Sequence, residues 1–145
     1  MNFEGQYSLN APRERVWTTI RDPAKLASAF DDFRDLAIVS PTVFTANGKV
    51  GVSVIRGTFR FRFEVVEESA PTHLVTVVRG RGIGSAVDLK IDVRLEERGA
   101  TTDLLWAASV QVSGTLAGIA QRLLEQSAER TIRDVFENLK KVVER

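Results

Sequence analysis

The final part of the chain carries the pattern that most constrains its fold. Between Ser113 and Val143, small and apolar residues recur at three- and four-residue spacing, and charged residues fill the positions between them. This spacing predicts one amphipathic helix with Ser113 as its N-cap. At about 1.5 Å per residue, the helix is roughly 45 Å long and needs a large apolar surface as its partner. The predicted buried stripe comprises Leu116, Ile119, Ala120, Leu123, Ser127, Ala128, Thr131, Ile132, Val135, Leu139 and Val142.

The middle of the chain supplies that surface, because apolar and polar residues alternate along it. The segments 59–65, 87–95 and 104–112 each place apolar side chains on one face. Further strands are predicted at 2–9, from Leu36, at 50–54 and at 74–79. The turns are predicted at Pro41, Asn47-Gly48, 69–71, 80–84 and 98–100. Short connections of this kind predict an antiparallel sheet of seven strands, one face of which the long helix covers.

Two short helices are predicted between the first strand and the rest of the sheet. Pro12 suits the first turn of a helix that continues to Arg21. Asp22-Pro23 ends it, because proline disfavours helical geometry in the residue before it. A second short helix is predicted from Ala24 to Phe30.

The composition predicts one soluble domain spanning 1–145. Apolar residues make up 43% of the chain and charged residues 27%, which is enough to bury a core. The net charge of +1 creates no bulk field that favours nucleic acid or membrane, and the chain has no cysteine for a disulfide or a thiolate metal site. No secretory signal and no membrane-spanning stretch is evident, so we expect a cytoplasmic protein, with peripheral contact to the inner face of the membrane left open. No cofactor and no metal is predicted.

Several local motifs accompany this order of elements. Phe3-Glu4-Gly5 is followed by Ala11-Pro12 and Val16-Trp17, Arg56-Gly57-Thr58-Phe59 lies in the middle, and Val112-x-Gly114-x-Leu116-Ala117 lies within the stretch WAASVQVSGTLAGIAQRLL. Together they resemble the CoxG family, named for a protein associated with carbon monoxide dehydrogenase, of the SRPBCC, or START-like, superfamily. The resemblance implies an α+β helix-grip fold of the START/Bet v type. It also implies a role beside molybdenum hydroxylases, in maturation or in membrane and quinone coupling.

A curved sheet that grips a long helix leaves space where small helix residues face large sheet residues. Ligand pockets are mostly apolar with a few polar groups, and the hydroxyls of Ser127 and Thr131 would supply such groups here. The alternative is a close-packed core with no cavity. The predicted lining comprises Trp17, Phe30, Phe33, Phe59, Phe61, Phe63, Leu89, Ile91, Trp106, Ala108, Leu123, Ser127 and Thr131.

An enzyme site is harder to find. His73, the only histidine, lies beside a hairpin turn, where an exposed surface residue is the simpler interpretation. Asp31 and Asp32 could share a proton, but adjacent loop residues normally point apart. The run from Gly80 to Gly84 superficially resembles a phosphate-binding loop, yet it joins two strands, which favours a turn. No catalytic residue is predicted.

A cluster of arginines is expected on the outer face of the sheet. If the chain turns at Ser69–Thr72, Arg60 and Arg62 lie near Arg81 and Arg79 of the next strand. The phase of the strand at 74–79 stays open at this point, and a solvated surface is the alternative. An anionic partner or lipid headgroups would suit such a patch, whereas nucleic acid is disfavoured because no exposed aromatic accompanies it. The predicted patch comprises Arg56, Arg60, Arg62, Arg79 and Arg81.

These observations leave three functional hypotheses. The first is a non-enzymatic CoxG-like accessory protein that binds a hydrophobic molecule, a quinone or a lipid, and docks on a partner enzyme such as a molybdenum hydroxylase. The second is a small SRPBCC enzyme, similar to cyclases or hydrolases, that acts on an apolar or aromatic substrate. The third is a cavity-free interaction module. A titratable group in the cavity wall would favour the second hypothesis, and a filled core would favour the third.

Overall fold

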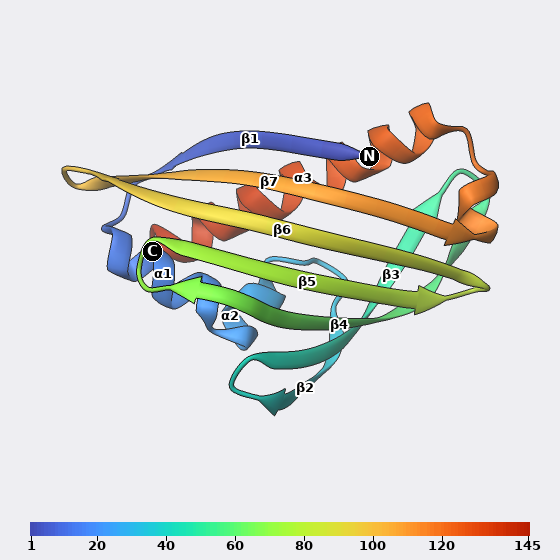
Figure 1. Ribbon diagram of the computed structural model, residues 1–145, viewed down its shortest axis with the longest axis horizontal. Coiled ribbons are helices and arrows are strands. Elements are labelled where there is room, and N and C mark those ends of the chain that lie inside the picture. Colours follow the sequence, from blue (N-terminus) through green and yellow to red (C-terminus); the bar gives the residue numbers. More distant parts are fainter.

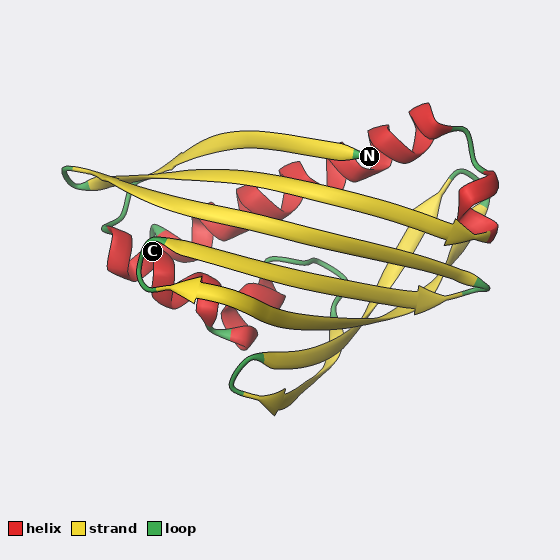
Figure 2. Ribbon diagram, in the orientation of Figure 1, coloured by secondary structure: helices red, strands yellow, loops and turns green.

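The computed structural model describes all 145 residues as two layers, a curved antiparallel sheet and the helices that cover one of its faces (Figures 1 and 2). The predicted seven strands are present, in the spatial order β1-β7-β6-β5-β4-β3-β2. All neighbouring strands are antiparallel. The strands are β1 (Asn2–Leu9), β2 (Arg34–Ser40), β3 (Val43–Val52), β4 (Ile55–Ser69), β5 (His73–Gly82), β6 (Ser85–Arg98) and β7 (Thr101–Gly114).

The two short helices follow β1, as the proline positions predicted. They are α1 (Arg13–Arg21) and α2 (Pro23–Ser28). Asp22 separates them and caps α2, because its Oδ1 accepts hydrogen bonds from the backbone N–H groups of Ala24 and Lys25 at 2.9 and 3.3 Å. The chain closes with a short 3-10 helix, η1 (Thr115–Gly118), and the long helix α3 (Gln121–Val143).

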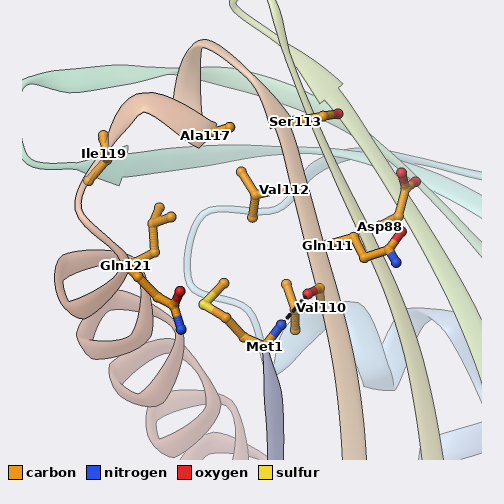
Figure 3. A pocket seen from close by; sticks show the side chains of 10 residues that line it. Met1, Asp88, Val110, Gln111, Val112, Ser113, Ala117, Ile119 and Gln121 are labelled. Carbon is orange, nitrogen blue, oxygen red and sulfur yellow. Dashed lines mark hydrogen bonds between the residues drawn. The ribbon is translucent and has the colours of Figure 1, made fainter.

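The predicted start of the long helix at Ser113 is wrong. Ser113 still belongs to β7, which pairs with β6 as far as Gly114 (Figure 3). The chain leaves the sheet at Gly114, whose φ of 77° and ψ of -147° favour glycine. Ile119 is again extended, so α3 begins only at Gln121. With 23 residues it is about 35 Å long rather than 45 Å.

The predicted turn at Asn47-Gly48 is also wrong, because both residues lie inside β3. A Cβ on Gly48 would lie 2.7 Å from the ring of Phe33 and 3.1 Å from that of Phe61. The glycine therefore makes room for two aromatic rings and does not serve a turn. The chain turns instead at Pro41-Thr42 and at Ser53-Val54.

The buried side chains form three separate clusters between the sheet and the helices. The largest joins α1, β1, β7 and the C-terminal half of α3 around Leu104 and Leu139. A second surrounds Phe44 and Phe63 beside α2. The third lies at the η1 end of the sheet, around Phe59 and Leu116. The core of this domain is thus divided into three parts, and α3 spans more than one of them.

The helix α3 is held mainly at its C-terminal end. Leu139 and Val143 are the only fully buried residues of α3. Beside them, Asn138 Nδ2 donates to the carbonyl oxygen of Ala29 at 2.9 Å, which ties α3 to the end of α2. Figure 1 shows this end of α3 next to α1 and α2. The N-terminal half of α3 has no comparable anchor.

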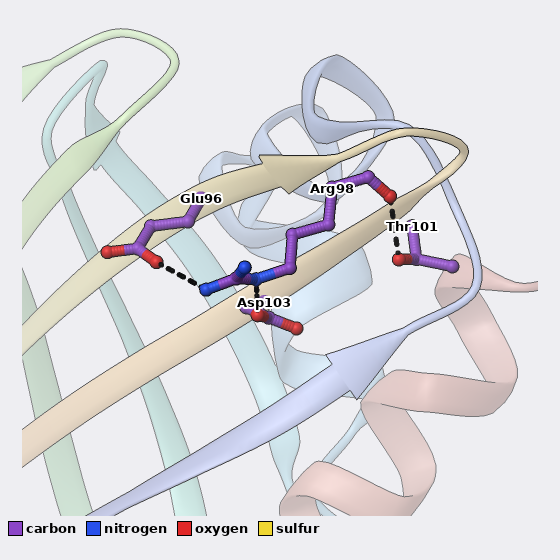
Figure 4. Close-up of polar contacts among 4 residues, drawn as sticks. All are labelled: Glu96, Arg98, Thr101 and Asp103. Carbon is purple, nitrogen blue, oxygen red and sulfur yellow. Dashed lines mark hydrogen bonds and ion pairs between the residues drawn. The ribbon is translucent and has the colours of Figure 1, made fainter.

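The β6–β7 hairpin is reinforced by a partly buried ion pair (Figure 4). Arg98 Nε donates to the buried carboxylate of Asp103 on the opposite strand. Arg98 Nη2 also reaches the exposed Glu96 at 3.4 Å, and Thr101 Oγ1 donates to the carbonyl oxygen of Arg98 at 3.0 Å. The hairpin end is therefore fixed by side chains as well as by its backbone hydrogen bonds.

We expect Asp103→Asn to lower the free energy of unfolding by about 1 kcal/mol, because the buried oxygen loses its charge-assisted hydrogen bond while the arginine head group stays solvated. Urea denaturation followed by circular dichroism measures this change. Glu96→Gln is the matched control, and its effect should stay below about 0.5 kcal/mol because that carboxylate is exposed. Equal effects of the two substitutions would contradict the assigned role of Asp103.

Candidate functional site

The inner face of the sheet, which α3 covers, is apolar and only half-buried at its centre. Strand β6 points Val87, Leu89, Ile91 and Val93 towards the helix layer, and all four keep accessible surface. A close-packed core would bury apolar side chains on a central strand completely. The middle of this face is therefore less tightly covered than the three clusters around it.

Aromatic side chains form the wall of this region on β3, β4 and the loop after α2. Phe30 and Phe33 stack with their ring centroids 4.1 Å apart, and Phe33 stacks on Phe61 at 5.5 Å. Phe61 lies across Gly80 of the next strand, where a Cβ would lie 2.6 Å from its ring. Glycines of the neighbouring strands thus allow the rings to lie flat on the sheet.

The residues predicted to line a cavity fall into three groups. Half-buried residues face or border the inner face, whereas fully buried ones belong to the three clusters behind it. Leu123 and Thr131 correct the prediction: Leu123 is 39% exposed and Thr131 is exposed as well. The helix is rotated relative to the predicted stripe, so that Leu124 packs against the Phe59 cluster. The half-buried group is Trp17, Phe30, Phe33, Phe61, Leu89, Ile91 and Ser127, and the buried group is Phe59, Phe63, Trp106 and Ala108.

A pocket of about 460 Å³ lies between the start of β1, the end of β7 and the first turn of α3 (Figure 3). Its apolar lining comes from inward-facing strand residues and from the segment that leads into α3. Asp88, Gln111, Ser113 and Gln121 add polar groups. The apolar lining residues are Met1, Val110, Val112, Ala117, Ile119 and Leu124.

The sequence analysis did not include these pocket residues in the predicted site. Met1 lies there because β1 runs beside β7, and its amino group donates to the carbonyl oxygen of Val110 at 2.8 Å. Ile119 lies there because the chain between β7 and α3 is not helical. The inward alternation of Val110 and Val112 along β7 was the only available signal for this pocket.

The titratable residues considered for catalysis lie away from the inner face. His73 begins β5, and its Nε2 lies 3.0 Å from Oδ1 of Asp92, a residue that shares the outer face. Asp31 accepts a hydrogen bond from Asn138 Nδ2 at 3.0 Å, and Asp32 is exposed beside it. Along the central stretches of β4, β6 and β7, no carboxylate or imidazole faces α3. This arrangement offers no general acid or base to a ligand held there.

The glycine-rich run at the end of β5 is part of a hairpin. Gly80 and Gly82 are strand residues, and only Ile83-Gly84 form the turn into β6. A Cβ on Gly82 would lie 2.5 Å from the carbonyl oxygen of Thr58, so close strand packing explains this glycine. The run opens no helix, as a phosphate-binding loop would.

On the outer face, arginines of β4 and β5 lie directly opposite one another. Arg60 pairs in register with Arg81, and Arg62 with Arg79. This is the pairing that the turn after Ser69 predicted. The open question of phase is also resolved, because Val78 faces inward beside Phe63 and Arg79 faces outward.

A family model for CoxG, the G component of carbon monoxide dehydrogenase, matches residues 5–144. This chain belongs to the CoxG family. No curated protein matches the sequence significantly. The family assignment confirms the resemblance seen in the local sequence motifs.

Solved structures place this CoxG-family chain in the START-like fold. A conserved protein from Geobacillus kaustophilus is 26% identical, with a TM-score of 0.91 over 99% of this chain and 95% of that chain. A START superfamily protein from Mycobacterium smegmatis is 12% identical, with a TM-score of 0.79 over 99% and 97% of the two chains. Ara h 8.0201 is 14% identical, with a TM-score of 0.72 and the same coverage. The last two similarities show the fold alone, and they confirm the predicted helix-grip architecture.

Proposed function

We propose that this CoxG-family chain is a non-enzymatic accessory protein that holds a hydrophobic molecule, a quinone or a lipid, between α3 and the inner face of the sheet. The observation that carries the proposal is the half-buried apolar row Val87, Leu89, Ile91 and Val93 on a central strand beneath the helix layer. An apolar ligand would complete the burial of this row, at about 25 cal/mol for each Å² removed from water.

The surroundings support binding rather than reaction. No acid or base faces the helix along the central inner face, so a bound molecule meets aromatic and aliphatic side chains. The indole Nε1 of Trp106 is buried without a hydrogen-bond partner. A carbonyl or hydroxyl oxygen of the ligand would satisfy this donor.

The partner follows from the family rather than from the site. The family takes its name from carbon monoxide dehydrogenase, so we propose that this chain acts beside an enzyme of that kind, a molybdenum hydroxylase. None of its helices has the length and hydropathy needed to cross a bilayer.

Ligand binding is tested with decylubiquinone, which quenches tryptophan fluorescence, because Trp17 and Trp106 both border the inner side of the sheet. We expect saturable quenching of the unmodified protein. Ser127→Phe adds a ring on the half-buried side of α3 and should weaken binding by at least about tenfold, or 1.4 kcal/mol.

Thr131→Phe is the matched control, since it places the same ring one turn further along the exposed side of the helix. Its dissociation constant should stay within about twofold of that of the unmodified protein. If decylubiquinone and phospholipid neither quench the fluorescence nor raise the melting temperature, the proposed function is wrong.

A further inference from the structure

Cations are concentrated on one part of the outer face, between the β3–β4 turn and the middle of β4, β5 and β6. Only Glu64 and Asp88 interrupt them there. The whole chain has a net charge of only +1, so this excess is balanced by acidic residues elsewhere. The cations of this arginine face are Lys49, Arg56, Arg60, Arg62, Arg79, Arg81 and Lys90.

The arrangement of these cations is costly for an isolated sheet. The pairs Arg60–Arg81 and Arg62–Arg79 put like charges directly opposite one another, which destabilises a strand pair. Two of the four arginines have carboxylate partners: Arg62 pairs with Glu64 at 2.8 Å and Arg81 with Asp88 at 2.9 Å. The other two, Arg60 and Arg79, form no ion pair in the structure. They remain available to an external carboxylate.

A groove of about 400 Å³ runs over β5, β6 and β7 beside these arginines. Arg79, Arg81 and Lys90 line it together with Asp88. Val77 provides apolar surface, and Ser109 and Gln111 add neutral hydrogen-bonding groups. A groove lined in this way accepts an extended chain that carries negative side chains.

We propose that the arginine face is the docking surface for a carboxylate-rich segment of a partner protein. Arginine binds carboxylates through two parallel hydrogen bonds, and it is enriched in protein interfaces. The interspersed carboxylates Glu64 and Asp88 disfavour a uniformly anionic bilayer, but they suit a partner whose charges alternate. This inference rests on the proposed accessory role, in which the chain docks on an enzyme.

The probe is a fluorescently labelled poly-L-glutamate peptide, with binding measured by fluorescence anisotropy at two salt concentrations. We expect the double substitution Arg60→Glu/Arg79→Glu to weaken binding by at least about tenfold, because it reverses both unpaired arginines. Binding of the unmodified protein should fall as salt rises. Arg130→Glu/Arg133→Glu is the matched control: it makes the same change of charge on the exposed side of α3 and should weaken binding less than about twofold.

Three outcomes would overturn the proposal. The peptide could fail to bind at low salt, or both double variants could weaken it equally. Vesicles of phosphatidylglycerol could instead bind through Arg60 and Arg79 while the peptide does not, which would make the surface a membrane site. Quinone quenching reports separately on the interior. Ser127→Phe should therefore leave peptide binding intact, and Arg60→Glu/Arg79→Glu should leave quinone binding intact.

Discussion

Replacing Phe59 with alanine should lower the free energy of unfolding by about 3–5 kcal/mol, the largest loss we expect from a core truncation in this domain. Phe59 has no exposed surface, and it packs with Val52 and Leu116 in the cluster at the η1 end. Removal of the ring leaves a cavity that strand and helix backbones cannot fill by relaxing. Urea denaturation monitored by circular dichroism measures the loss.

Val54→Ala is the control for this substitution. Val54 is 92% exposed in the turn between β3 and β4, so its truncation should change stability by less than about 0.5 kcal/mol. A second comparison, Phe61→Ala, should cost less than Phe59→Ala, because Phe61 is only half-buried. If Phe59→Ala costs less than Phe61→Ala, the division of the core described above is wrong.

Replacing Gly114 with alanine should cost at least about 3 kcal/mol, because two penalties add at this residue. Its φ of 77° with ψ of -147° strains any residue that carries a Cβ. The new Cβ would also lie 2.1 Å from the carbonyl oxygen of Gly84 in the β5–β6 turn. The exit of the chain from β7 towards η1 would have to shift, and the melting temperature measures the result.

Gly118→Ala, four residues further on, is the control. An added Cβ at Gly118 meets nothing within 4 Å, so this substitution should change stability by less than about 0.5 kcal/mol. The same methyl group is thus added at both ends of η1, and only the one at Gly114 should be costly. Equal melting temperatures for the two variants would show that Gly114 is not required for the turn.

The order of elements could be predicted from sequence because each element carries its own periodic signal. Alternation at period two marked β1, β4, β6 and β7, and Asp22-Pro23 marked the break between α1 and α2. The errors arose where one residue type serves two purposes. Glycine at position 48 suggested a turn but makes room for rings, and glycine at position 114 turns the chain inside a run that was predicted to be helical.

The candidate site was only partly predictable. The inward strand residues, among them Leu89 and Ile91, followed from alternation alone. The rotation of α3 could not be predicted from its stripe, because Leu123 and Leu124 are adjacent and both fit an apolar face. The pocket beside Met1 depends on the irregular segment before α3, and no local pattern predicts where such a segment lies.

The unequal anchoring of α3 has a consequence for how a guest could enter and leave. A rod fixed at Leu139 and Val143 acts as a lever, whose free tip at Gln121 moves furthest for a given tilt. That tip forms one side of the pocket beside Met1. A small swing of the rod would widen this opening while every strand-to-strand ladder stayed closed, so exchange of the contents would not require the domain to unfold.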